Sequence, residues 1–214
     1  PAVKVERALN MVGPFTQVGV SAVGSTSFDN AGLSPNTAYY YRVRATNASG
    51  DSGYSGVTSA VTLPSPPATP SNFTATALSG RSVQLAWQDN SSNESGFEVL
   101  RLPPQGGAYQ LITTTGANAT GYVDNTGLTG SSAYSYRLRA VNAGGGSPYI
   151  SAAATTLPDL PSVPTGLSGS SLSHTQVQLT WTDASDNETG FQVQRRPEGG
   201  AFATITTTGP NVTE

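Results

Sequence analysis

Cysteine is absent from this chain of 214 residues, and histidine occurs once, as His174. The chain can therefore form no disulfide and has no thiol nucleophile, and a single histidine excludes the common zinc-finger ligand sets. Charged residues make up only 11% of the sequence, and the formal net charge is −3. That balance argues against a nucleic-acid partner or an anionic membrane surface, since both attract basic proteins. No apolar run approaches the ~20 residues that cross a bilayer, so the sequence predicts no membrane span.

Glycine and proline are plentiful by contrast, with 24 and 15 residues, and the sequence repeats itself. Val83–Arg101 returns as Val177–Arg195 at an offset of 94 residues, and Ala38–Asn47 returns as Ala133–Asn142 at an offset of 95. Self-similarity at a fixed period indicates a tandem array of one structural unit. Because 214 residues hold about 2.3 such periods, we expect one complete repeat and two partial ones.

Proline-rich segments mark the expected boundaries between the repeats. Leu63–Pro70 and Leu157–Pro164 each follow one apolar strand pattern and precede another. Proline cannot donate to a strand ladder and favours an extended, semi-rigid connector. We therefore expect a partial repeat over residues 1–63 with strands three to seven, a complete repeat over residues 64–157, and a partial repeat over residues 158–214 with strands one to four.

The hydrophobic pattern of the middle repeat has a period of two, which is typical of strands, and it shows no helical period. Clusters of glycine, asparagine, aspartate and proline separate the strand patterns, as turns require. The seven predicted strands cover residues 73–78, 83–87, 97–101, 109–113, 119–124, 134–141 and 150–156. Seven short strands in one repeat predict an all-β fold, an antiparallel sandwich.

Several motifs in these repeats resemble the fibronectin type III domain, of the kind found in secreted bacterial proteins. Trp87 and Trp181 stand where that family buries a tryptophan on its second strand, and Phe97 and Phe191 follow on the next strand. The resemblance implies tandem seven-stranded, immunoglobulin-like sandwiches, one complete and two partial.

A second motif resembles the tyrosine corner of the same family. Leu128 is followed six residues later by Tyr134, and Leu33 is followed in the same way by Tyr39. In such a corner the phenol hydroxyl bonds to a nearby backbone group and fixes the crossover between the sheets. The residues that we expect in the cores are Trp87, Trp181, Tyr39, Tyr134, Leu33, Leu128, Phe97 and Phe191.

The acidic residues of the loop between the second and third strands are candidates for chemistry. Asp89 and Glu94 recur as Asp183 and Glu188, and Asp186 joins them. Aspartate and asparagine often bond the backbone of their own turn, and this is the interpretation we favour. A calcium site is the alternative, because hard cations take several carboxylate ligands. Catalysis by paired carboxylates would need a substrate cleft that a repeated 94-residue sandwich does not offer.

No other residue predicts catalysis, a metal site or a cofactor. His174 lies in a predicted turn and has no recurring acidic partner to orient it. Exposed aromatic rings could stack on sugars, and the candidates are Tyr40, Tyr54, Tyr122 and Tyr149. We expect no enzyme and no cofactor, and a glycan remains a possible partner.

The sequence favours a non-catalytic structural module, a spacer in a stalk, surface or filament protein outside the cell or on its surface. The alternative is an accessory carbohydrate-binding or adhesion module of a secreted polysaccharide-degrading enzyme or adhesin. The expected partners are neighbouring repeats in the same chain or another chain. The partial repeats would expose apolar sheet faces, so we expect them to be completed either by a longer array or by another chain.

Overall fold

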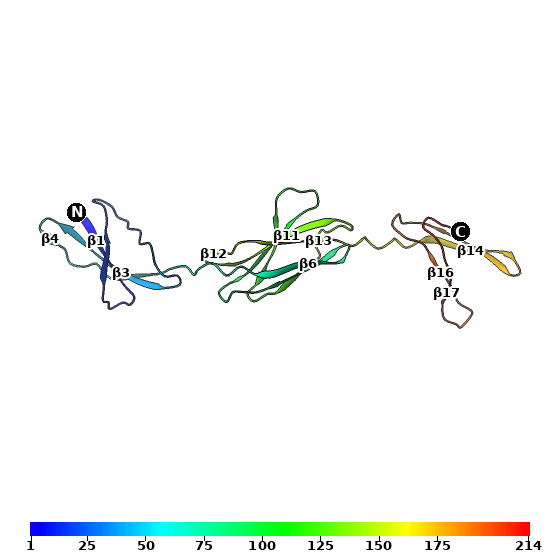
Figure 1. The fold of residues 1–214 in the computed structure, drawn as a ribbon, viewed down its shortest axis with the longest axis horizontal. Coiled ribbons are helices and arrows are strands. Elements are labelled where there is room, and N and C mark those ends of the chain that lie inside the picture. The colour runs from blue at the N-terminus through cyan, green and yellow to red at the C-terminus, as the bar shows by residue number, and fades with distance from the viewer.

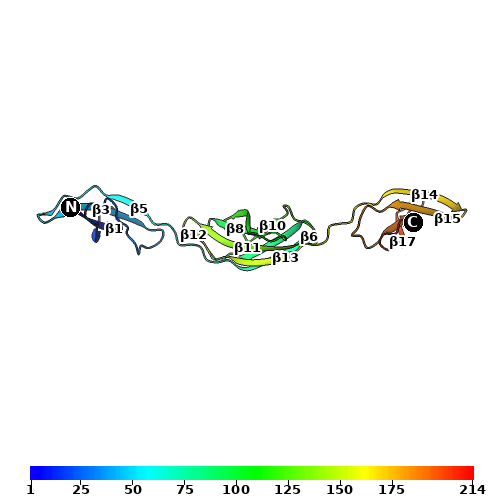
Figure 2. The same cartoon turned by 90° about the horizontal axis from the view of Figure 1, so that it is seen from above.

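Three β-structured units follow one another along the chain in the computed structural model, which describes all 214 residues. Figures 1 and 2 show them end to end, joined by extended connectors, with the N-terminus in the first unit and the C-terminus in the third. Every regular element is a strand, and every strand pairing is antiparallel. The predicted all-β class with tandem sandwiches is therefore confirmed.

The middle unit contains two facing sheets. One sheet has the strand order β10-β7-β6, and the other has β8 and β11 at its centre. Its strands are β6 (Ser71–Ser79), β7 (Ser82–Gln88), β8 (Gly96–Leu102), β9 (Gln110–Gly116), β10 (Gly121–Asp124), β11 (Ala133–Asn142), β12 (Gly145–Gly146) and β13 (Ile150–Thr155). The seven predicted strands correspond to β6 to β11 and β13, because alternating residues bury one face of each strand and leave the other in water.

The core of the middle unit lies between its two sheets. The indole of Trp87 from β7 packs on Phe97 from β8, with ring centroids 5.5 Å apart, and is 5% exposed. Burial alternates along β11, where Tyr134, Tyr136, Leu138 and Ala140 point inward. The remaining buried apolar residues of the cluster are Val83, Leu85, Val99 and Leu128.

One buried carboxylate joins the two sheets. Asp124 at the end of β10 is fully buried, and it accepts hydrogen bonds from Arg101 Nη1 at 2.7 Å and from the Tyr136 hydroxyl at 3.0 Å. Burial, together with this carboxylate, raises the pKa of Tyr136, so its hydroxyl stays protonated and donates. A buried charge needs such partners, because losing one leaves the others without compensation.

The first unit has a single sheet with the order β2-β1-β3-β4 and with β5 also on β3. Its strands are β1 (Ala2–Ala8), β2 (Thr16–Val20), β3 (Ala38–Asn47), β4 (Gly50–Asp51) and β5 (Thr58–Val61). These five strands correspond to β8, β9, β11, β12 and β13 of the middle unit. No strand forms between β2 and β3, which differs from the expected fifth strand. In the middle unit the fifth strand, β10, pairs only with β7, and residues 1–63 contain no counterpart of β7.

The third unit has two separate hairpins. Its strands are β14 (Thr165–Ser173), β15 (Gln176–Thr182), β16 (Gln192–Arg195) and β17 (Ala203–Thr207). Trp181 packs on Phe191 with ring centroids 5.5 Å apart, the same distance as for Trp87 and Phe97. Both residues are nevertheless only half-buried, whereas we expected them in a core. The reason is that residues 158–214 supply no sixth strand to cover them.

Replacing Asp124 with alanine should destabilise the middle unit by roughly 3 kcal/mol, because the Arg101 guanidinium and the buried Tyr136 hydroxyl lose the carboxylate to which they donate. The matched control is Glu98→Ala, which removes the partly exposed partner of Arg139 and should cost less than about 1 kcal/mol. Amide hydrogen exchange of β7 and β8, followed by mass spectrometry, measures both effects within this unit. Equal loss of protection in the two variants would contradict the role assigned to Asp124.

Candidate functional site

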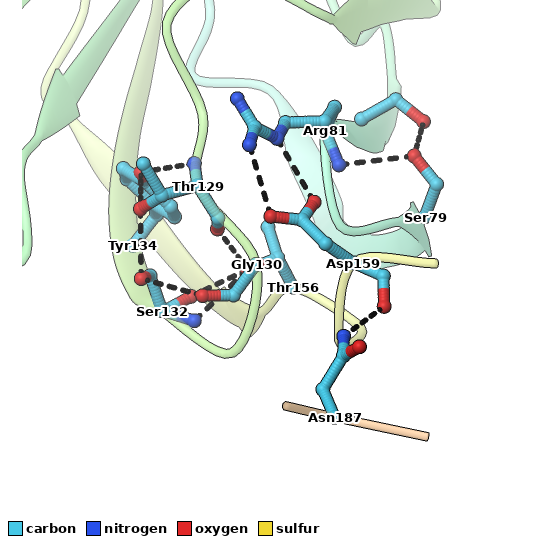
Figure 3. Close-up of polar contacts among 10 residues, drawn as sticks. Ser79, Arg81, Thr129, Gly130, Ser132, Tyr134, Thr156, Asp159 and Asn187 are labelled. Atoms are coloured by element: carbon cyan, nitrogen blue, oxygen red, sulfur yellow. Dashed lines mark hydrogen bonds and ion pairs between the residues drawn. The ribbon is translucent and has the colours of Figure 1, made fainter. Parts of the chain in front are cut away.

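The joint between the middle and third units contains an ion pair. Asp159 accepts hydrogen bonds from Arg81 Nε and Arg81 Nη2, both at 2.9 Å, so the guanidinium binds both carboxylate oxygens in a bidentate contact (Figure 3). Arg81 lies in the turn between β6 and β7, and Asp159 lies in the connector that follows β13. The hydrogen bonds from Arg81 lower the pKa of Asp159. The two side chains are 67% and 41% exposed, so this pair orients the connector more than it stabilises the fold.

Two glycines allow the connector to approach the middle unit. A Cβ atom on Gly130 would lie 2.7 Å from the backbone nitrogen of Asp159, and one on Gly80 would lie 2.5 Å from Asp159 Oδ1. Backbone hydrogen bonds hold the connector there, since Leu157 N donates to Ser79 O at 3.2 Å and its carbonyl accepts from Ser131 N at 3.1 Å. The end of the middle unit thus contacts the connector closely and holds its backbone by hydrogen bonds.

The third unit holds the same connector residue from its other side. Asn187 Nδ2 donates to the backbone carbonyl of Asp159 at 2.7 Å, as Figure 3 shows. The backbone N–H of Ser162 donates to Ser185 Oγ at 3.1 Å. Asp159 therefore contacts both units, with its side chain on the one before it and its carbonyl on the one after it.

The joint between the first and middle units repeats half of this arrangement. Asn93 Nδ2 donates to the carbonyl of Ser65 at 3.0 Å, and Asn142 Nδ2 donates to the same oxygen at 2.8 Å. Asn93 and Ser65 each precede Asn187 and Asp159 by 94 residues. The asparagine clasp therefore recurs with the repeat, while the carboxylate of the second joint is replaced by a serine in the first.

A tyrosine links each joint to the interior of its unit. The backbone N–H of Thr129 donates to the Tyr134 hydroxyl at 3.0 Å, and the backbone N–H of Ser34 donates to the Tyr39 hydroxyl at 2.9 Å. Both tyrosine rings are buried, while their hydroxyls reach the loop that meets the connector. Of the leucines that precede them, Leu128 is buried and Leu33 is only half-buried, because the first unit has one sheet.

The profile of the family described as Fibronectin type III domain matches residues 68–156, which is the middle unit with its two sheets. The middle unit is a fibronectin type III domain. The resemblance expected from the tryptophan and tyrosine motifs is thereby confirmed.

Relatives of these fibronectin type III repeats occur inside bacterial glycosidases. Exoglucanase B of Cellulomonas fimi is 34% identical over 187 residues, which cover 80% of this chain and 16% of that enzyme. Endoglucanase B of the same organism is 32% identical over 239 residues, covering all of this chain and 22% of the enzyme. Chitinase A1 of Niallia circulans is 30% identical over 159 residues, covering 69% of this chain and 21% of the enzyme. The chain spans less than a quarter of the length of each of these relatives.

A solved structure also resembles the chain as a whole. The FN1–FN3 domains of chicken CNTN1 are 18% identical and superpose with a TM-score of 0.41, over 99% of this chain and 76% of that one.

The acidic loops of the middle and third units accept hydrogen bonds from nearby backbone and serine groups. Asp89 accepts from the backbone N–H of Ser91 at 3.0 Å, and Glu94 accepts from the Ser91 hydroxyl and from Asn118 N at 3.1 Å. The hydrogen bond from Ser91 and those from backbone N–H groups lower the pKa of Glu94. Its carboxylate therefore stays ionised as an acceptor within the loop.

The third repeat has the two backbone contacts of this loop, while the Ser185 hydroxyl donates to Asn187 Oδ1 and not to Glu188. Asp183 accepts from Ser185 N at 3.0 Å, and Glu188 accepts from Asn211 N at 3.1 Å. Asp186 is exposed. Neither loop gathers three acidic or histidine side chains at distances that fit a metal ion. The calcium alternative for Asp89, Glu94, Asp183, Asp186 and Glu188 thus gains no geometric support.

His174 is exposed in the turn between β14 and β15. No candidate for a membrane-spanning helix is present. At the second joint, Arg81 and Asp159 bring side chains of two repeats together, whereas the contacts described for the first joint lie within residues 64–157.

Removing the Arg81 guanidinium should raise the pKa of Asp159 toward the ordinary value of about 3.9, because the charge-assisted hydrogen bonds favour the ionised carboxyl. The contact is present when the pH is above the pKa of Asp159 and is lost as the pH falls through it. The measurement is a carbon-detected NMR titration of Asp159 in the parent chain and in Arg81→Gln. Identical titration of Asp159 in both chains would show that Arg81 does not hold it.

Proposed function

We propose that this chain is a non-catalytic spacer from a larger extracellular protein that degrades polysaccharide. The observation that carries the proposal is the recurring clasp at the joints, in which Asn93 and Asn187 fasten the connector to the repeat that follows. In a flexible tether such directed contacts would be unnecessary, whereas a spacer that keeps two attachments apart requires them. We propose the divisions at residues 63/64 and 157/158 as the boundaries of its repeats.

The relatives support the choice of parent protein. Their names identify two glucanases and a chitinase, and the matched region is less than a quarter of each. We therefore assign catalysis in the parent protein to a part outside these repeats. The substrates of such enzymes are polymers met outside the cell, which supports an extracellular location.

The acidic residues support a non-catalytic role. The Glu94 carboxylate accepts hydrogen bonds from Ser91 and Asn118, and its pKa is lowered, whereas a general acid needs a raised pKa. Asp89 accepts from Ser91 in the same loop. These contacts account for the carboxylates without a reaction.

The second candidate function is that of an accessory carbohydrate-binding module. It is favoured by two exposed tyrosines, Tyr54 and Tyr149, which are 44% and 38% exposed. A stalk or filament would use the same joints, with neighbouring repeats as partners, but no contact in the structure favours it over a spacer in an enzyme.

Breaking the second joint should loosen it and leave the first joint unchanged. Because the chain has no cysteine, spin labels can be placed by single substitutions at exposed sites. The pair Gln105→Cys with Glu198→Cys spans the second joint, and Val12→Cys with Gln105→Cys spans the first. In Asn187→Ala, which removes the amide that binds the Asp159 carbonyl, the distance distribution from electron double resonance should broaden across the second joint only.

The distance distributions of the parent chain test whether it acts as a spacer. A narrow distribution across both joints supports it. A distribution across the second joint that is already as broad in the parent chain as in Asn187→Ala would contradict it, because the clasp would then not restrict the repeats.

A further inference from the structure

The outer face of the sheet that contains β1 and β3 has a tyrosine lying flat on arginine. The guanidinium carbon of Arg42 lies 3.7 Å from the centroid of the Tyr54 ring, and that of Arg44 lies 4.9 Å away. A carbon this close to the centroid can only be over the face of the ring, not at its edge. The 44% of Tyr54 that is exposed therefore comes from the opposite face and the rim.

Three further contacts fix the orientation of this ring. The Tyr54 hydroxyl donates to Glu6 Oε1 at 2.9 Å. Glu6 Oε2 accepts from Arg42 Nε at 3.0 Å and from Arg42 Nη2 at 2.8 Å. Burial acts to raise the pKa of Glu6, but the hydrogen bonds from Arg42 and Tyr54 outweigh it and lower the pKa. Because Glu6 stays ionised, it holds both the ring and the guanidinium beneath it.

The middle repeat has a corresponding ring 95 residues later. Tyr149 corresponds to Tyr54, and its ring centroid lies 4.6 Å from the guanidinium carbon of Arg139, the counterpart of Arg44. Arg139 Nε donates to Glu98 Oε2 at 2.7 Å, and Glu98 faces Arg139 in the strand register where Lys4 faces Arg44. Tyr149 is 38% exposed. We call Tyr54 and Tyr149 the aromatic platforms.

A second ring accompanies each platform on the same sheet, stacked on Arg42 itself in the first repeat and on Arg137 in the middle repeat. Arg42 also lies 4.3 Å from the centroid of Phe15, and Arg137 lies 4.1 Å from that of Tyr109. Phe15 and Tyr109 are 94 residues apart, so this pair recurs as well. Neither guanidinium group is needed to fill a core, because both lie on the outer face of a sheet whose inner face carries the apolar residues. The recurring feature is an exposed strip of rings and arginines.

We propose that the aromatic platforms are contact sites for the flat pyranose faces of an insoluble polysaccharide. A sugar ring presents C–H groups on its faces and hydroxyls around its rim, so a fixed aromatic face suits the first and nearby N–H donors suit the second. The Tyr54 ring, whose hydroxyl is already held by Glu6, loses little conformational freedom on binding. One platform in each of two consecutive repeats adds a gain from multivalency, because the connector keeps the second site near once the first is bound.

Binding of the complete 214-residue chain to microcrystalline cellulose and to chitin, measured as depletion from solution, tests this proposal. The parent chain should be retained by at least one of the two polymers. The double variant Tyr54→Ala with Tyr149→Ala should bind roughly tenfold more weakly, since two stacked rings are lost. The double variant Tyr54→Phe with Tyr149→Phe keeps both rings and should bind more tightly than the alanine variant, although it loses the hydrogen bond from Tyr54 to Glu6.

Two controls make the outcome decisive. Leu160→Ala removes an apolar side chain that is exposed in the second connector, away from the platforms, and should leave binding unchanged. Thermal unfolding shows whether the alanine variants remain folded. Retention by neither polymer would overturn the proposal, as would equal losses in the phenylalanine and alanine variants, because the ring would then not be the binding element.

This proposal shares the parent protein with the proposed spacer function but not its evidence. Spin-label distances across the second joint report the spacer, and depletion on polymer reports the platforms. A rigid chain that binds neither polymer would support the spacer function and contradict the proposal of aromatic platforms. A flexible chain that binds through its rings would contradict the spacer function and support the platforms.

Discussion

The hydrogen bond that the backbone N–H of Thr129 donates to the Tyr134 hydroxyl is the contact on which the second joint depends. The ring of Tyr134 is buried in the core, while its hydroxyl fixes the surface loop that contains Gly130. Because that loop is fixed, Gly130 offers bare backbone to Asp159, and Ser131 can donate to Leu157. The packing of the sandwich thus determines where the chain leaves it.

The same corner in the first repeat shows which part of the joint varies. Tyr39 accepts from Ser34, and the backbone N–H of Asn36 donates to Leu63 O at 3.1 Å, so the exit from this repeat is built in the same way. The difference comes two residues after each leucine, where Ser65 stands in one connector and Asp159 in the other. The Asp159 side chain reaches back to Arg81 in the turn between β6 and β7, and residues 1–63 contain no counterpart of that turn. The exit geometry is therefore shared by the two repeats, and the second joint adds an ion pair to it.

The sequence was sufficient for the strands of the middle repeat, because alternation and turn residues are local signals and the facing sheet was present to satisfy them. It was insufficient where a partner strand decides the outcome. Phe28 lies in the segment that would be a fifth strand, yet that segment has no second strand to pair with and forms none. The sequence also did not predict the pairing of Arg81 with Asp159, since 78 residues separate the two and the equivalent connector position holds a serine.

The joints and the platforms use different surfaces of one repeat, and this separation follows from the sandwich itself. A sandwich buries the inner faces of its sheets, so its ends and its outer faces remain for other contacts. Arg81, Gly130 and Asp159 lie where the chain leaves the middle repeat, whereas Tyr149 and Arg139 belong to the outer face. The end contacts are hydrogen bonds that need fixed backbone geometry, and the outer face needs only side chains that project from strands. A repeat can therefore change its surface chemistry without changing its joint, and a spacer built in this way can acquire binding residues while keeping its shape.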